Sequence, residues 1–300
     1  MPVTASPRAG LRPRSPALWF ILPACLVLLG VYLGPMLYAL RSSFTYWVLT
    51  MPGSEDDPAG LSNYTEVLQS REFWSAVRVT VTYALSSIAC GLILGTIFAL
   101  LLNLDFFWRT FFRSAMMIPM VITPAVIGIF WKLLYEQEDG VFNHLLNGVG
   151  LPGVAWLSLD MALPSIIVMD VWQTTPFFML VILAGLHAID ENQLDAARVD
   201  GTSRWQMFRY ILLPHLLPYM LIAASFRCIG AMGDFDKIWL LTGGGPGDRT
   251  TTITIYTFKT GFSSFDIGRT TAIAWIFVVI VLIVSWPLVR HLFKTAAADR

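Results

Sequence analysis

Six stretches of this chain hold 20 or more mostly apolar residues each, and a helix needs about 20 such residues to cross the hydrocarbon core of a bilayer. A segment in hydrocarbon must satisfy its backbone hydrogen bonds internally, so these runs are expected to be helical. Charged residues make up only 13% of the chain, about half of the roughly 25% in soluble domains. The sequence therefore predicts an all-α polytopic membrane protein. Its predicted spans are residues 18–40, 74–102, 111–134, 163–186, 211–232 and 270–293.

One transmembrane domain, residues 18–293, is expected between short tails at 1–17 and 294–300. Several prolines fall inside the spans, where proline usually kinks a helix. Kinked and packed helices favour a transport pathway over a simple anchor. These prolines are Pro23, Pro35, Pro119, Pro124, Pro176 and Pro218.

Basic residues gather on connections that would share one side of the membrane. With six spans, that side carries Arg8, Arg12, Arg14, Arg109, Arg113, Arg198, Arg204, Arg209, Arg290, Lys294 and Arg300. The positive-inside rule makes this side cytoplasmic, with both termini. The opposite connections hold acidic clusters at 55–57 and 136–139, and also Lys237. The net charge is zero, so no nucleic-acid partner is indicated.

The sequence offers no catalytic residue, no metal site and no nucleotide-binding loop. Its four histidines are scattered without metal-ligand spacing. The run Thr-Gly-Gly-Gly-Pro-Gly-Asp-Arg-Thr at 242–250 lacks the lysine of a phosphate-binding loop. We expect a tight outer loop, with glycines at positive φ rather than in contact with a ligand. The residues concerned are Gly243, Gly244, Gly245 and Pro246.

Two ionisable residues, Asp170 and Arg227, lie inside the spans at similar depths. Burying a charge in lipid is costly unless the charge is paired or hydrated. They are expected to face the bundle interior and either pair or line a polar cavity; a purely structural ion pair and snorkelling of Arg227 are the alternatives. An aromatic ring beside amides and hydroxyls suits a sugar. The candidate pathway residues are Asp170, Trp172, Gln173, Thr174, Thr175, Phe177 and Arg227.

Residues 190–210 form a charged segment between the fourth and fifth spans. Residues 194–199 favour a short helix, which Gly201 would end in a left-handed conformation. Ser203 and Gln206 fit a capping box that starts the next helix. Acidic residues alternate with the arginines here, and acidic groups are disfavoured at an anionic leaflet. The segment therefore predicts a cytoplasmic elbow that binds a protein partner rather than headgroups.

The elbow also resembles the EAA loop of binding-protein-dependent ABC importer permeases. The matching residues are Asp195-Ala196-Ala197, Asp200-Gly201, Phe208, Ile211, Leu213-Pro214 and Pro218. Asp195 stands where that family usually has glutamate. Other segments are similar to the carbohydrate branch, which includes maltose and glycerol-phosphate types. They are Pro35, Ser43-Phe44, Trp172, Pro176-Phe177, Ala184-Gly185-Leu186, residues 241–246, Thr250, Tyr256 and Phe262.

The resemblance implies a type I importer fold of six helices with a cytoplasmic coupling helix, in the bacterial inner membrane. It implies a second, usually different permease subunit, two cytoplasmic ATPase subunits that bind ATP and Mg, an external solute-binding protein, a sugar or polyol substrate and surrounding lipid. This chain would bind no nucleotide and would not be an enzyme. The coupling residues carried over are Asp195, Ala196, Ala197, Asp200, Gly201, Arg204, Phe208 and Pro214.

The implied function is uptake by alternating access. Within the same class, a permease for a non-sugar solute is the alternative. A secondary transporter driven by an ion gradient would favour more buried carboxylates in the spans and would not explain the elbow. A membrane-anchored structural or signalling protein would usually bring a soluble domain, which the sequence does not indicate.

Overall fold

The computed structural model describes residues 17–298, and most of them are helical. Arg8, Arg12, Arg14 and Arg300, which belong to the predicted tails, lie outside the described residues. Within the described range, extended backbone pairs only in two isolated bridges, Thr45 with Pro58 and Val48 with Asp266. The predicted all-α class is thus confirmed for this range.

Five helical stretches are long and apolar enough to cross a membrane. The first combines α1 (Ala17–Leu28), a π-helical turn over Leu29–Leu33 and α2 (Gly34–Ser42). The second and fourth predicted spans correspond to α4 (Arg71–Leu102) and α8 (Ala162–His187). The sixth corresponds to α14 (Ile267–Ala298).

The third predicted span, residues 111–134, is wrong as a single helix. It consists of α5 (Arg109–Val121) and α6 (Pro124–Leu134), which are bent by 99° to each other. A residue before proline is sterically driven out of the helical region, and Thr123 is extended with ψ of 142°. Counting this bent pair as one span gives six.

The fifth span begins earlier than the predicted residue 211. A continuous helical stretch over Arg204–Gly233 joins α10 (Arg204–Met207), a π-helical turn over Phe208–Leu212 and α11 (Leu213–Gly233). Pro214 has no backbone N–H to donate, and the wider π turn lies directly before it. The second helix of the elbow and the fifth span therefore belong to one continuous helical stretch.

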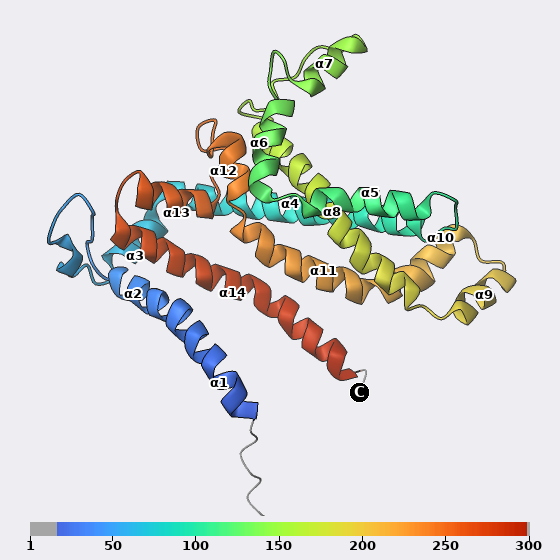
Figure 1. The fold of residues 1–300 in the computed structure, drawn as a ribbon, viewed down its shortest axis with the longest axis horizontal. Coiled ribbons are helices and arrows are strands. Elements are labelled where there is room, and N and C mark those ends of the chain that lie inside the picture. Colours follow the sequence, from blue (N-terminus) through green and yellow to red (C-terminus); the bar gives the residue numbers. More distant parts are fainter. Residues whose placement is uncertain (1–16, 299–300) are drawn as a thin grey trace, which may run out of the picture.

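The long helices pack around α8, with α4 as its closest neighbour and α11 contacting both. Gly95 lets α4 approach α8, because an added Cβ would stand 2.5 Å from the Cβ of Phe178. Phe178 and Met179 are fully buried in this seam. α14 packs against α11, and Figure 1 shows α1 diverging beside it.

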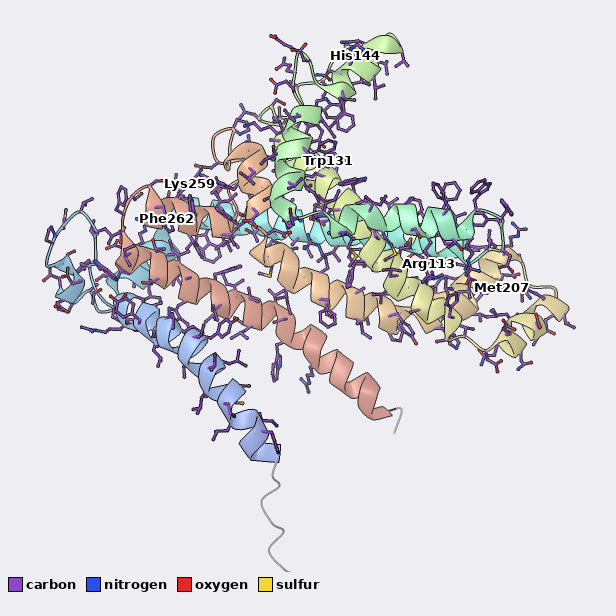
Figure 2. The ribbon with its side chains drawn as sticks, in the orientation of Figure 1. Arg113, Trp131, His144, Met207, Lys259 and Phe262 are labelled. Carbon is purple, nitrogen blue, oxygen red and sulfur yellow. The ribbon has the colours of Figure 1, made fainter. Side chains whose placement is uncertain are left out.

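Four short helices that the sequence analysis did not predict complete the fold. They are α3 (Ser62–Gln69), α7 (Val141–Gly148), α12 (Asp236–Thr242) and α13 (Ile253–Phe262). α12 packs on α6 and α13 on α14. Figure 1 shows α6 and α7 projecting away from the long helices, while α9 (Glu191–Val199) and α10 lie at the end where α4 meets α5. Figure 2 places Met207 and Arg113 at that end and Lys259 at the other.

Candidate functional site

The elbow between the fourth and fifth spans is a short capped helix, a tight turn and a second capped helix. The side chain of Asp190 accepts a hydrogen bond from the backbone N–H of Asn192 and caps α9. Gly201 ends the helix at φ of +72°, as the sequence predicted. The backbone N–H and the hydroxyl of Thr202 both donate to the carbonyl of Ala197, at 3.1 and 2.7 Å. These bonds fix the angle of the turn.

The second helix of the elbow begins with the predicted capping box. Ser203 accepts from the backbone N–H of Gln206, whose side chain accepts from the backbone N–H of Ser203 at 2.8 Å. Such reciprocal caps satisfy two otherwise unpaired donors at a helix start. The next helix is therefore anchored at its first turn, directly before it continues into the fifth span.

Most side chains of the elbow are exposed to solvent. Asp195 pairs with Arg198 at 2.7 Å, and both side chains are largely exposed. Ala197 faces inward, whereas Val199 is 88% exposed. Of the remaining coupling candidates, Ala196, Asp200, Gly201 and Arg204 are exposed, Phe208 is half-buried against Trp205, and Pro214 lies in the first turn of α11.

Asp170 and Arg227 pair in the interior, with 2.6 Å between the carboxylate and guanidinium. Two further charges join them. Lys237 contacts the carboxylates of both Asp170 and Asp234, and Arg227 lies 2.8 Å from Asp234. We call these four residues the ionic cluster. Two cations meet two anions, so the buried charges neutralise each other, as low-dielectric surroundings require.

Neighbouring polar side chains complete the ionic cluster. Tyr83 donates to Asp234 at 2.7 Å, and Ser87 donates to Asp170. Both come from α4, and both are buried. The cluster therefore joins α4, α8, α11 and α12, because each helix contributes a charge or a donor.

Gln173 links the ionic cluster to the break in the third span. Its side-chain oxygen accepts from Lys237 at 3.2 Å, and its amide nitrogen donates to the carbonyl of Ile122 at 3.4 Å. Ile122 is one of the two residues between α5 and α6. The cluster and the 99° bend are thus parts of one connected arrangement.

The sequence analysis missed Asp234 and Lys237. It assigned Lys237 to an outer connection, but α12 folds back against α6 and leaves Lys237 only 2% exposed. One signal was available. The apolar run Ile238 to Leu241 follows Lys237 directly, which is unusual for a solvated loop and typical of a short buried helix.

The predicted pathway residues on α8 separate into two groups. Asp170 and Gln173 face the ionic cluster, whereas Trp172 is 38% exposed and lines a groove of about 660 Å³ between α4, α5 and α8. Trp172 also contacts Trp131, with ring centroids 5.5 Å apart. The structure therefore does not gather these residues into one cavity.

The remaining pathway candidates, Thr174, Thr175 and Phe177, contact other groups of their own helix, α8. The hydroxyls of Thr174 and Thr175 donate to the carbonyls one turn earlier, at 2.8 and 2.6 Å. Phe177 is half-buried, with its ring 5.8 Å from that of Phe178. The hydrogen of each hydroxyl is thus already used within the helix.

The glycine-rich run forms a tight loop after α12. Gly243, Gly244 and Gly247 adopt positive φ, as expected, whereas Gly245 does not and precedes a cis peptide bond to Pro246. The hydroxyls of Thr250 and Thr251 donate to the carbonyls of Gly245 and Gly244, at 2.8 and 2.9 Å. Side chains from the end of the loop thus bind its beginning.

Known proteins are similar in sequence to this chain over nearly its whole length. A probable ABC transporter permease protein of Sinorhizobium fredii is 57% identical over 95% of this chain and 93% of its own length. The trehalose/maltose transport system permease protein MalF of Thermococcus litoralis is 38% identical over 87% of this chain and 88% of its own. The sulfoquinovosyl glycerol permease protein SmoG of Agrobacterium fabrum is 33% identical over 86% and 84%.

A solved structure shows the same fold. The bacterial ABC transporter involved in the import of alginate, an acidic polysaccharide, superposes with a TM-score of 0.79 at 22% identity, covering 93% of this chain and 95% of that one. Residues 91–295 match the family described as binding-protein-dependent transport system inner membrane component. This range contains the elbow, the ionic cluster and the glycine-rich loop. The chain belongs to this family of transport permeases, as the resemblance of its elbow implied.

Proposed function

We propose that this permease carries a sugar or a related polyol into the bacterial cell by alternating access. The named relatives support the substrate class, since two of them serve trehalose/maltose and sulfoquinovosyl glycerol. The solved alginate transporter, which also handles a carbohydrate, has the same fold. Trp172 on its groove offers an aromatic face for a pyranose, while Asp170 and Arg227 hold the adjacent helices.

The proposed orientation places the elbow and both termini in the cytoplasm. The start of α5, which carries Arg109 and Arg113, lies at the same end of the bundle as α9 and α10 (Figure 1), and Figure 2 shows Arg113 there. Arg109 also approaches His187 at 3.5 Å, just before the elbow. Basic residues at one end of a helical bundle favour the cytoplasmic side.

The observation that carries the proposal is the way the elbow joins the fifth span. α9 is exposed, its turn is fixed by Gly201 and Thr202, and α10 continues into α11 without a break. A partner that moves α9 would therefore move the fifth span with it. α11 contacts α4, α8 and α14, so this motion would reach the pathway helices.

The proposed coupling role of the elbow implies several partner proteins. Two ATPase subunits would bind ATP and Mg and contact the elbow, and a second permease subunit would complete the pathway. Asp195 would contact an ATPase side chain by exchanging its present partner, Arg198. A solute-binding protein would deliver the sugar from outside; the alginate transporter has been solved with such a periplasmic protein.

Substitution of Gly201 tests the coupling role. An added Cβ would meet no atom within 4 Å, so the cost of Gly201→Val arises from φ of +72° alone. A β-branched residue at positive φ costs about 1–3 kcal/mol. We expect the variant to insert and assemble, but to hydrolyse ATP without sugar uptake in reconstituted vesicles.

Gly148→Val is the matched control. Gly148 also has open space around it, but it lacks a positive φ. It should retain uptake. If Gly201→Val keeps both uptake and sugar-stimulated ATP hydrolysis, the elbow is not the coupling element.

Uptake of trehalose, maltose and sulfoquinovosyl glycerol by the unaltered system tests the substrate class.

A further inference from the structure

A second hollow, distinct from the groove at Trp172, opens beside the glycine-rich loop. Its volume is about 540 Å³, within the range of roughly 300–1,000 Å³ that small-molecule sites occupy. It lies at the end of the bundle opposite the elbow, between the first turns of α4, the start of α8 and the loop. Its polar lining comes from Ser75, Arg78, Thr82, Asp160, Asp248 and Arg249.

The charged groups in this hollow differ from those of the ionic cluster. In the cluster every charge has an oppositely charged neighbour. Within residues 17–298, the side chains of Arg78, Asp160 and Arg249 make no hydrogen bond or ion pair. Only Asp248 has a charged neighbour, Lys259, at 3.8 Å. All three side chains are exposed, so water hydrates them and a ligand can replace that water.

The hollow matches the chemistry of a carbohydrate. A sugar hydroxyl both donates and accepts hydrogen bonds, so it needs acceptors and donors together. Asp160 supplies carboxylate acceptors, and Arg78 and Arg249 supply planar guanidinium donors that can bind two oxygens at once. Leu159, Leu163 and Pro164 add apolar surface for the C–H faces of a ring.

The hollow and the groove at Trp172 lie along the same two helices, α4 and α8. Ser75, Arg78 and Thr82 follow a spacing of three and four residues, so they share one face of α4. Farther along the same two helices, α4 contributes Cys90 and Leu94 to the groove at Trp172. α8 likewise contributes Leu163 to the hollow and Val168 to the groove.

We propose that this hollow is an outer carbohydrate subsite, where Arg78, Asp160 and Arg249 bind the hydroxyls of the sugar before it reaches Trp172. The inference rests on the proposed function as a sugar permease. The glycine-rich loop forms one side of the hollow. The hydrogen bonds from Thr250 and Thr251 close this loop and thereby fix the position of Arg249. This assigns the loop a binding role in addition to its turn geometry.

Cysteine protection tests the subsite. Ser75 is exposed and lines the hollow, so Ser75→Cys should react with a membrane-impermeant maleimide added outside right-side-out vesicles of the assembled transporter. Trehalose or maltose, whichever the unaltered system takes up, should slow this labelling several-fold. Ser263→Cys, exposed near the end of α13 and outside the hollow, should be labelled at the same rate with and without sugar.

Two arginine variants give an independent measure. Arg78→Gln should reduce uptake about tenfold, because a hydrogen bond from a charged group is lost. Arg71→Gln, on the same helix but outside the hollow, should retain uptake. If the unaltered system transports sugar but Ser75→Cys is unprotected and Arg78→Gln is fully active, the subsite is wrong while the proposed function stands. If the unaltered system takes up no sugar, the proposed function itself fails.

Discussion

Arg227 lies 2.6 Å from Asp170 across the interior of the bundle and joins the fifth span to the fourth. Both side chains are almost entirely buried. Removal of one partner from a buried pair costs about 3–5 kcal/mol, because the other charge is left uncompensated. Arg227 and Lys237 contact Asp234 as well, but Asp170 is the more sensitive of the two carboxylates because it is fully buried, whereas Asp234 is 17% exposed.

Asp170→Asn should therefore destabilise the protein strongly. The variant keeps the shape of the side chain but leaves two cations facing one carboxylate, Asp234, so a loss of about 3–5 kcal/mol is expected. Thermal unfolding of the detergent-purified protein measures it. Asp234→Asn should lower the melting temperature less, because Asp234 is 17% exposed and reaches water. Equal melting temperatures for Asp170→Asn and the unaltered protein would contradict this.

Lys237 and Asp234 should behave as a coupled pair. They lie 3.1 Å apart, and each single change leaves the cluster with a net charge. The double variant Lys237→Met/Asp234→Asn restores neutrality around Asp170 and Arg227. We expect its destabilisation to be smaller than the sum of the single changes by about 1–3 kcal/mol.

The exposed pair of Asp195 and Arg198 is the control for this double-mutant cycle. Its atoms are closer, at 2.7 Å against 3.1 Å, but both side chains are largely exposed to water. Surface pairs contribute about 0–1 kcal/mol, so the cycle Asp195→Asn/Arg198→Gln should be nearly additive in the free energy of unfolding. Equal coupling in the two cycles would show that burial of the cluster is not what makes it strong.

The elbow was predictable because its signals are local. Gly201 and the Ser203–Gln206 capping box depend on residues within one turn of each other, and both are present. The long spans were predictable for the same reason, since twenty apolar residues in sequence suffice. The signal for a helix break at Thr123 and Pro124 is also local, but the direction of the 99° bend depends on what α6 packs against.

The burial of α12 had one local signal, the apolar run Ile238 to Leu241, but nothing local indicated that its charged start would be buried too. It has seven residues, too few to cross a membrane, and it begins with Asp236 and Lys237. Lys237 enters the interior because Asp170, 67 residues earlier in the chain, neutralises it there. A contact of that separation leaves no periodic pattern in the sequence. The ionic cluster was therefore half predicted, through Asp170 and Arg227, and half missed.

Gly95 should tolerate no larger residue. A Cβ at this position would stand 2.5 Å from the Cβ of Phe178 and 2.9 Å from the backbone nitrogen of Met179. Neither atom can move without separating α4 from α8. Gly95→Val should cost about 1–3 kcal/mol through overpacking. Gly34→Val, where an added Cβ meets no atom within 4 Å, should unfold at the temperature of the unaltered protein.

Trp172 should contribute to transport rather than to assembly. It is 38% exposed on its groove, and its one aromatic neighbour on α6 is Trp131. Trp172→Ala removes the ring face on which a sugar could stack, so uptake should fall about tenfold. Trp172→Phe keeps a ring and should recover most of the uptake.

The ATPase subunits should still co-purify with Trp172→Ala in the amounts found for the unaltered permease, because the elbow lies at the far end of α8. Trp286→Ala is the control, since Trp286 on α14 is 67% exposed and borders neither the groove nor the hollow. Its uptake should be unchanged. If Trp172→Ala instead fails to assemble, while Trp286→Ala does not, the ring packs the helices together and the substrate contact must lie elsewhere along α4 and α8.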